Sequence, residues 1–451
     1  MAKSRIEKSP ITFTPDNLAV VLNLMNSENY LMEYFKETDD KGRYLYWDKF
    51  KWHVPKEHDV KKAWLITKWC RFTKRKYISL LDKENEEFHY CNPDSLQAKL
   101  YKIAKLSGEG MTSNSSIRQK FLISSLVMEE AISSAQLEGA STTRRVAKKM
   151  LVEERKPRSE DEQMILNNYL LMNEVKELID APLSIEMIKH FHKIATLGTS
   201  ENAVVPGVFR TDNEIVITDG VNNEILHQPP LYTDLEERLE KLCEFANTIH
   251  SGEEGDDFID PIVKAIILHF MIGYEHPFAD GNGRTARAIF YWFMLKNGFA
   301  FFEYLSISKL LKVAPVKYGM AYLYTEIDEN DLTYFIYYQA DIILRSMDEL
   351  FGYLDEKSKE FDEVVELLEN SKMSDCLNFI QKNIVKKAMK NPGRVFTVKE
   401  IANHYEVSEN TARKYLKELM NHKILAPMKE GRSMKYIALA EIKDVLDRKC
   451  D

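Results

Sequence analysis

The sequence is poor in cysteine and has no apolar run long enough to cross a bilayer. Its 451 residues include five cysteines, an odd number, scattered along the chain without a Cys-x-x-Cys pair. This pattern argues against a structural zinc site and indicates reduced thiols in a cytosol-like compartment. Apolar stretches such as 265–272 fall far short of the roughly 20 residues of a membrane span, and the N-terminus lacks the apolar core of a signal peptide. We therefore expect a cytoplasmic protein with no membrane partner.

An excess of positive charge is also missing. The net charge is −8 at pH 7, with 29% charged and 44% hydrophobic residues, which is an ordinary globular composition. Such a chain does not coat nucleic acid along its whole length, although one basic face is compatible with the total. The sequence has no internal repeats and no Gly-x-x-x-x-Gly-Lys-[Ser/Thr] loop, so a P-loop enzyme is excluded. The length allows two or three domains.

What is present is one polar segment, 276–287, placed between two apolar stretches. Asp260 and Pro261 are typical of the first residues of a helix, and the apolar run 288–295 follows the segment directly. The region therefore predicts a helix, a tight loop and a second helix. A dinucleotide-binding turn, which the pattern Gly-x-Gly-x-x-Ala at 281–286 also matches, is rejected because a helix rather than a buried strand precedes it.

The start of the second predicted helix has the properties of an anion site. Gly281, Asn282 and Gly283 lie where unpaired backbone N–H groups and the helix dipole favour negative charge. Arg284 and Arg287 are three residues apart and can face the same anion. Such donors suit a polyphosphate whose charge increases during a reaction.

Two further side chains add the groups that a transfer reaction needs. Asp280 offers the single carboxylate with which Mg²⁺ commonly binds beside phosphate oxygens. His276 can accept a proton from an attacking hydroxyl. The set predicts phosphoryl or nucleotidyl transfer from a nucleoside triphosphate, whereas a merely packed loop explains none of this convergence.

The segment resembles the signature of Fic-domain proteins, His-x-Phe-x-[Asp/Glu]-Gly-Asn-Gly-Arg-x-x-Arg, and all eight specified positions match. The resemblance extends over about 117–340 and implies a helical core that moves AMP from ATP, with Mg²⁺, to a Ser, Thr or Tyr hydroxyl of a protein. By the same resemblance the roles are as follows: His276 is the general base, Phe278 a core anchor, Asp280 the Mg²⁺ ligand, Gly281, Asn282 and Gly283 the anion hole, Arg284 a phosphate contact and Arg287 the γ-phosphate contact.

A predicted amphipathic helix over 117–139 carries Ser134 and Glu138 on one face, four residues apart. A solvent-exposed pair is the simplest interpretation, but a carboxylate at a helix C-terminus opposes the dipole and favours a cationic partner. The pair matches the inhibitory pattern [Ser/Thr]-x-x-x-Glu-[Gly/Asn] of the family. The resemblance thus implies that Glu138 pairs with Arg287 and displaces the γ-phosphate.

A predicted strand pair lies between the two motifs, and it is the one convincing strand pair that the sequence offers for this helical domain. Its first strand consists of Glu214, Ile215, Val216, Ile217 and Thr218, and the segment 225–230 completes a hairpin. A lone hairpin is stable only if something covers or uses its edge. The resemblance identifies it as the family's flap, on which the target hydroxyl is docked by strand pairing.

We expect a mainly α-helical protein of three parts: a helical N-terminal domain over 1–108, with one helix at 60–81, a Fic core over 109–355, and a winged helix over 371–451. In the last part, Thr397 and Glu400 match a capping box. The candidate recognition helix, 409–420, carries Arg413, Lys414 and Lys417.

Three alternatives stay open at this point. The winged helix binds either DNA or protein, so the chain is alternatively a transcriptional regulator with a weakly active, nucleotide-sensing Fic core. The family resemblance also allows removal of AMP, with Glu138 positioning water. A homodimer is expected by analogy alone.

Overall fold

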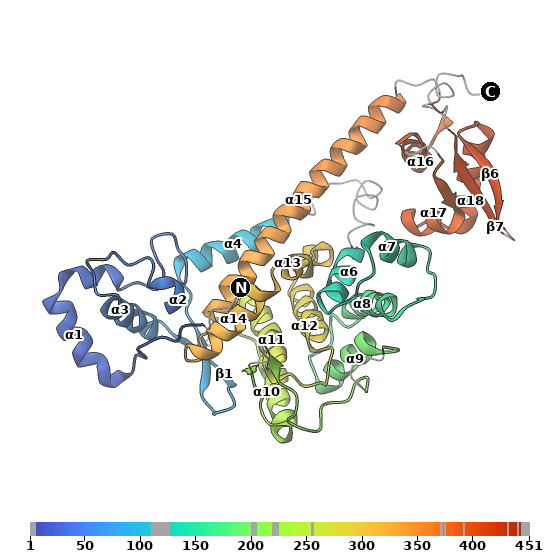
Figure 1. The fold of residues 1–451 in the computed structure, drawn as a ribbon. Helices are drawn as coiled ribbons and strands as arrows, with labels where there is room; N and C mark the ends of the chain where they lie inside the picture. The colour runs from blue at the N-terminus through green and yellow to red at the C-terminus, as the bar shows by residue number, and fades with distance from the viewer. Residues whose placement is uncertain are drawn as a thin grey trace.

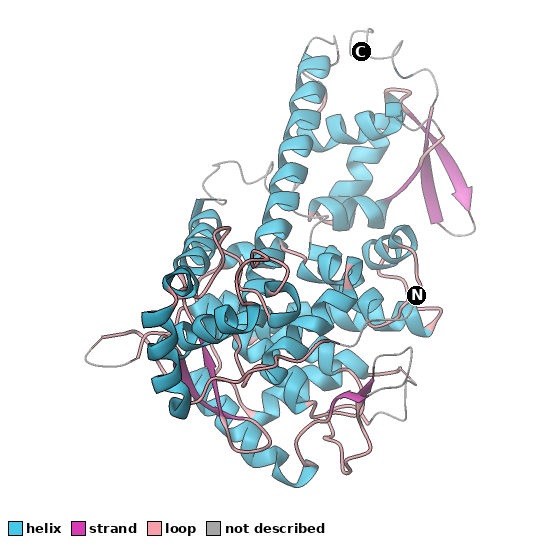
Figure 2. Cartoon of the chain, turned by 60° about the vertical axis from the view of Figure 1, so that its left-hand side comes forward, coloured by secondary structure: helices cyan, strands magenta, loops and turns pink. Residues whose placement is uncertain are grey.

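The structure, a computed structural model of the chain, is mainly helical, and it confirms the predicted fold class (Figures 1 and 2). It describes residues 6–109, 127–199, 205–218, 225–253, 257–369, 373, 376–390, 393–430, 433–439 and 442. Within these ranges no helix is both long and apolar enough to cross a membrane. Cys70, Cys91 and Cys243 are buried free thiols, but Cys376 is disulfide-bonded, so the expectation of reduced thiols throughout is wrong. Scattered spacing along a sequence does not report proximity in the fold.

The N-terminal part contains a strand pair that the sequence did not predict. The helix expected over 60–81 ends at Thr73, and a strand follows because Ile78 and Leu80 alternate with exposed residues. Asp82 accepts bonds from the backbone of Glu84 and Glu86 and so closes the hairpin turn. The elements are η1 (Pro15–Asn17), α1 (Leu18–Ser27), η2 (Asn29–Tyr34), α2 (Trp47–Phe50), α3 (Val60–Thr73), β1 (Lys76–Leu81), β2 (Glu87–Tyr90) and α4 (Asp94–Glu109).

Two buried helices form the centre of the molecule. They are α11 (Pro261–Glu275) and α12 (Asn282–Lys296), and nearly every side chain on them is buried. Asp260 caps α11 by accepting a bond of 2.8 Å from the Ile262 N–H, as the sequence predicted. Because side chains on all sides of both helices are covered, both ends of the loop between them are fixed by the hydrophobic core.

The remaining elements surround this pair (Figure 1). The described part of the predicted inhibitory helix is α6 (Val127–Leu137), and residues 117–126 of that prediction lie outside the described ranges. The others are α7 (Arg144–Val152), α8 (Glu160–Glu177), α9 (Ile185–Thr196), β3 (Ile217–Thr218), β4 (Ile225–His227), η4 (Tyr232–Asp234), α10 (Leu235–Asn247), η5 (Ala300–Tyr304), α13 (Ile307–Val313), α14 (Pro315–Ile327) and α15 (Thr333–Glu369).

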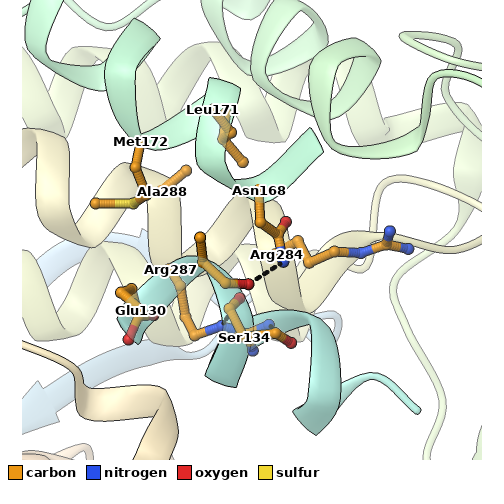
Figure 3. A pocket seen from close by; sticks show the side chains of 9 residues that line it. Glu130, Ser134, Asn168, Leu171, Met172, Arg284, Arg287 and Ala288 are labelled. Atoms are coloured by element: carbon orange, nitrogen blue, oxygen red, sulfur yellow. Dashed lines mark hydrogen bonds between the residues drawn. The ribbon is translucent and has the colours of Figure 1, made fainter. Parts of the chain in front are cut away.

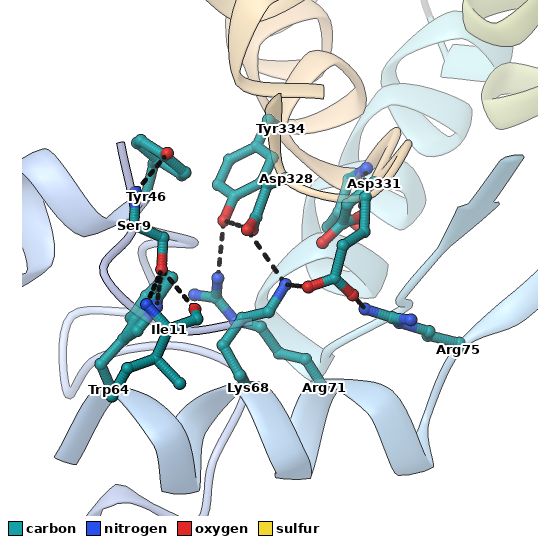
Figure 4. Close-up of polar contacts among 12 residues, drawn as sticks. Ser9, Ile11, Tyr46, Trp64, Lys68, Arg71, Arg75, Asp328, Asp331 and Tyr334 are labelled. Carbon is teal, nitrogen blue, oxygen red and sulfur yellow. Dashed lines mark hydrogen bonds and ion pairs between the residues drawn. The ribbon is translucent and has the colours of Figure 1, made fainter. Parts of the chain in front are cut away.

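A buried polar network joins α3 to the start of α15 (Figure 4). The Arg71 guanidinium lies 3.7 Å from the centre of the Tyr44 ring and donates to the Tyr334 hydroxyl at 2.8 Å. Lys68 donates to Asp328 at 3.0 Å, and both side chains are buried. One hydrophobic cluster also runs without a break from the N-terminal elements into the helices around α11 and α12. The N-terminal part is therefore fixed on the central helices.

The C-terminal part has a hydrophobic core of its own. Its elements are α16 (Phe379–Lys390), β5 (Val395–Thr397), α17 (Val398–Tyr405), α18 (Glu409–Asn421), β6 (Leu425–Glu430) and β7 (Ser433–Ala438), with sheet order β5-β7-β6. Thr397 accepts from the Glu400 N–H at 3.1 Å, as the capping box predicted. α15 reaches Glu369 without interruption.

Candidate active site

The loop between α11 and α12 starts at His276, which has left-handed backbone angles of φ 45° and ψ 57°. Its N–H closes the helix on Ile272 O at 3.1 Å, and its Nδ1 lies 3.3 Å from Gly273 O. Burial lowers the pKa of His276 to about 4, which outweighs the opposing effect of Gly273 O. The imidazole is therefore neutral at pH 7 and able to accept a proton.

The loop is held in shape by its own side chains. Phe278 is fully buried and stacks on His192 with the ring centres 3.6 Å apart. The Asn282 amide accepts from Phe278 N at 2.9 Å and donates to Phe278 O at 2.8 Å. Gly281 has φ 80°, and a Cβ on it would lie 2.7 Å from Thr196 Cγ2. The Asn282 side chain thus shapes the loop. Only the backbone N–H of this residue is then available to an anion hole.

His192 of α9 is a site residue that the sequence reasoning missed. Its Nδ1 accepts from Gly207 N at 2.9 Å and its Nε2 donates to Asp280 O at 2.9 Å. Burial lowers the pKa of His192 to about 4, so the ring is neutral at pH 7. With its proton on Nε2, it holds the loop through the bond to Asp280 O. A histidine on an apolar helix face gives no local signal of this role.

The face of α6 that carries Ser134 contacts Arg287 directly (Figure 3). Arg287 donates through Nε to Ser134 Oγ at 3.0 Å and through Nη2 to Glu138 Oε1 at 2.7 Å. Burial is the largest effect and disfavours the charge of Arg287, but Glu138, Tyr318 and Glu130 together outweigh it and raise the pKa of Arg287. A side chain on Gly283 would collide with the same carboxylate, so Glu138 lies over the first turn of α12. This is the position that the sequence predicted for an anion.

A second acid on the same face of α6, Glu130, was also missed. It accepts from Ser306 Oγ at 2.9 Å, from Ser308 Oγ at 2.5 Å and from Ser308 N at 3.2 Å. Burial raises the pKa of Glu130, and the serine bonds oppose that shift. Glu130, Ser134 and Glu138 follow one another at intervals of four, which is the signal that could have found it.

A small cavity lies between α6, α8 and α12 (Figure 3). Its volume is ≈ 10 Å³, about the space of one water molecule, and hence far too small for a nucleotide. Asn168 Oδ1, buried in its wall, has no hydrogen-bond partner among the described residues. The lining residues are Glu130, Ala131, Ser134, Asn168, Leu171, Met172, Arg284, Arg287 and Ala288.

Asp280 and Arg284 lie at the other side of the first turn of α12. Asp280 Oδ1 accepts from Gly281 N at 2.6 Å, and its Oδ2 lies 3.8 Å from Arg284. Arg284 is buried and donates to Ala195 O at 3.0 Å. The described residues contain no group of three or more metal-ligating side chains, so this one partly exposed carboxylate fits Mg²⁺ only together with phosphate oxygens.

The predicted strand pair is present but shorter than expected. β3 and β4 pair antiparallel, with Ile217 opposite His227 and Thr218 opposite Ile225. Of the predicted strand, Glu214, Ile215 and Val216 lie outside β3, since Glu214 N is bonded to Asp212 Oδ1 in a local turn. The segment 219–224 lies outside the described residues.

Comparison with known proteins identifies a domain within the chain. Residues 182–294 match the model of the Fic/DOC family. A protein adenylyltransferase fic-1 of Caenorhabditis briggsae is 39% identical over 61 residues, 14% of this chain and 12% of the relative. A protein adenylyltransferase Fic of Nematostella vectensis is 33% identical over 73 residues, 16% of each chain. The chain thus contains a Fic domain, as the loop motif predicted. It matches these curated relatives over less than a fifth of their length.

Solved structures of Fic proteins are similar to this chain at low identity. A Fic family protein of Desulfovibrio desulfuricans is 16% identical, with 77% of this chain and 95% of that chain covered and a TM-score of 0.46. Fic-1 of Caenorhabditis elegans is 18% identical, with 59% of this chain and 73% of that chain covered and a TM-score of 0.44.

Proposed function

We propose that this chain is a protein adenylyltransferase that moves AMP from ATP to a Ser, Thr or Tyr hydroxyl of a target protein, and that Glu138 holds it inactive. The observation that carries the proposal is the juxtaposition of His276, the first turn of α12 and the Glu138–Arg287 pair. The adenylyltransferase names of the relatives and the Fic domain support the transferase class.

In the proposed reaction the target hydroxyl oxygen attacks the α-phosphorus of ATP, and its proton passes to the neutral His276. The bond between the α-phosphorus and the bridging oxygen breaks, and pyrophosphate leaves. The backbone N–H groups of the first turn of α12, with Arg284 and Arg287, balance the charge on the phosphates. When bound beside Asp280, Mg²⁺ would add a further positive charge at the phosphate oxygens.

Inhibition follows from competition for one cation. The Arg287 guanidinium donates to Ser134 and Glu138, and the Glu138 carboxylate covers Gly283. A triphosphate reaching the same turn would have to displace that carboxylate, because two anions at one helix start repel each other. The proposed role of the flap is to pair its free edge with a segment of the target.

The test is incubation with ATP labelled at the α-phosphate. We expect Glu138→Gly to label itself or added protein at least about tenfold faster than the wild type, since it removes the competing carboxylate from Arg287, and a tenfold rate change corresponds to about 1.4 kcal/mol. Glu138→Gln, which keeps the shape but loses the charge, should fall between them. Labelling of Glu138→Gly that survives an added His276→Ala change would remove the general-base role. Equal labelling of wild type and Glu138→Gly would exclude inhibition by α6.

The reverse reaction, removal of AMP, uses the same groups with Glu138 positioning water. It predicts that a modified target releases AMP faster with the wild type than with Glu138→Gly. The wild type and Glu138→Gly therefore distinguish the two reactions. Addition of AMP should be faster with Glu138→Gly, and removal of AMP should be faster with the wild type.

A second candidate function is DNA binding by the C-terminal part, proposed as a winged helix. Arg413, Lys414 and Lys417 are exposed on α18, which favours it. Two of them lie 3.9 Å from acids of the same helix, Glu409 and Glu418, which reduces the positive electrostatic potential of α18. Absence of a mobility shift with duplex DNA at low salt would exclude this function.

A further inference from the structure

The last turn of α11 presents its carbonyl groups towards the flap. The final carbonyls of a helix have no partner within the helix and carry the negative end of its dipole. Here these are the carbonyls of Tyr274, Glu275 and His276, directly at the proposed base. Two side chains from the two arms of the flap bind them.

The first is Arg210, which precedes β3 and is buried. Its Nε donates to His276 O at 3.0 Å, and its Nη2 donates to Pro230 O and, at 3.5 Å, to Glu275 O. Its Nη1 donates to Asp212 O at 2.9 Å. One guanidinium thus joins the chain before β3, the chain after β4 and the end of α11.

The second is His227, buried in β4. Its Nε2 lies 2.8 Å from Tyr274 O and its Nδ1 lies 2.7 Å from Glu326 Oε2. A carbonyl only accepts, so Nε2 donates to Tyr274 O, and the other ring nitrogen faces the Glu326 carboxyl group. The ring then fixes β4 to both α11 and α14.

We propose that Arg210 and His227 are positioning residues that clamp both arms of the flap onto the last turn of α11. The clamp fixes the distance between His276 and a hydroxyl carried on the flap edge. This inference rests on the proposed function, since it assigns the flap to the target. Neither side chain contacts the first turn of α12 in the bonds described above, so the clamp acts on the hydroxyl side of the reaction and not on the nucleotide.

Charge gives the clamp a second effect. After burial, which is the main cause, the nearby charges of His227 and Arg210 also lower the pKa of His276, while Asp280 raises it. Both clamp residues therefore also favour the unprotonated form of His276.

The activity test uses Glu138→Gly as the parent, with Arg210→Lys and His227→Gln added separately. We expect the maximal labelling rate to fall by roughly tenfold to a hundredfold, because a displacement of about 1 Å costs that much. The dissociation constant of a non-hydrolysable ATP analogue should stay within about twofold. Arg238→Lys is the matched control, because Arg238 binds the Glu275 carboxylate at 2.8 Å and not the carbonyls at the end of α11. Its labelling rate should change by less than about threefold.

A readout independent of activity separates this inference from the proposed function. We expect the amides of β3 and β4 to exchange hydrogen at least about tenfold faster in Arg210→Lys and His227→Gln, at unchanged melting temperature. The ring titration of His276, followed by NMR, should move to higher pH in His227→Gln but not in Arg210→Lys, which keeps its charge.

Unchanged exchange in both variants would overturn the clamp. The clamp would also be overturned if Arg210→Lys and His227→Gln both labelled at the rate of an active Glu138→Gly parent. If the parent itself does not label, the proposed function fails, and the exchange measurement still decides whether the clamp exists.

Discussion

At the scale of single residues, Arg287 links the two motifs of the chain. It donates to Ser134 Oγ and to Glu138 Oε1 from a fully covered position. A buried guanidinium needs most of its donors satisfied, so Ser134 and Glu138 stabilise Arg287 in its buried position. ATP would have to replace both partners. Under the proposed inhibition, Ser134 therefore contributes as well as Glu138.

We predict that Ser134→Ala raises labelling by about fivefold over the wild type, less than Glu138→Gly. The change removes one hydrogen bond to a charged group, worth roughly 1 kcal/mol in this competition. Labelling with ATP carrying a radioactive α-phosphate measures it. Ser133→Ala, at the neighbouring buried position, should leave the rate unchanged, and a rise as large as that of Ser134→Ala would contradict the role of Ser134.

Buried histidines predict how stability depends on pH. Burial lowers the pKa of His89, His192 and His276 to about 4, and of His269 and His404 to about 3. The unfolded chain therefore binds more protons than the folded one between about pH 6.5 and 4, and stability falls as the pH falls through this window. We expect the melting temperature to drop by at least about 5 °C between pH 7 and pH 5 in calorimetry. In His192→Gln the drop should be smaller, and an equal drop would contradict the assignment of His192.

At the scale of elements, α6 is anchored at two points and not one. Glu138 binds Arg287, and two turns earlier Glu130 binds Ser306 and Ser308 at the start of α13. Ser306 makes no cap bond with its own helix, so Glu130 takes over the capping of α13. The helix is thus held in register along one face.

We predict that Glu130→Ala raises labelling by roughly fivefold and lowers the melting temperature by a few degrees, since it leaves Ser308 N without this acceptor. Glu130→Gln is the control, because its amide keeps an acceptor in place, and it should label within about twofold of the wild type. Wild-type labelling by a folded Glu130→Ala protein would show that Glu138 alone holds α6.

At the scale of the whole molecule, the C-terminal part lies beside α7 and contacts it through α17 (Figure 1). Asn403 of α17 donates to Val152 O, at the end of α7, at 2.7 Å, and Lys399 lies 3.1 Å from Glu154. α7 shares a small hydrophobic cluster with α6. A contact on α17 is thereby connected through α7 to the helix that carries Glu138.

We predict that Lys399→Glu and Glu154→Lys each raise labelling by about twofold to fivefold, and that the double exchange restores the wild-type rate. The pair is exposed, so the expected effect is small. In the Glu138→Gly parent the same changes should have no effect, because inhibition is already absent. A double exchange that labels like the sum of the single changes would show that the contact does not act on α6.

The sequence by itself determined the local features. The ends of α11, α17 and α18, the tight turn at Gly281 and the order of groups in 276–287 depend on backbone preferences and caps that act over a few residues. The same local rules failed at 60–81. There the spacing of buried side chains changes from that of a helix, up to Thr73, to the alternation of a strand from Lys76.

Only the tertiary structure decided which distant residues meet. Glu138 and Arg287 are 149 positions apart, and Arg210 and His276 are 66 apart. The family resemblance proposed the first pair, and the spacing of four residues could have indicated Glu130, but nothing in the sequence indicated the roles of His192 and Arg210. Their positions result from packing around α11 and α12, where burial forces each polar group to find a partner on whichever element lies beside it.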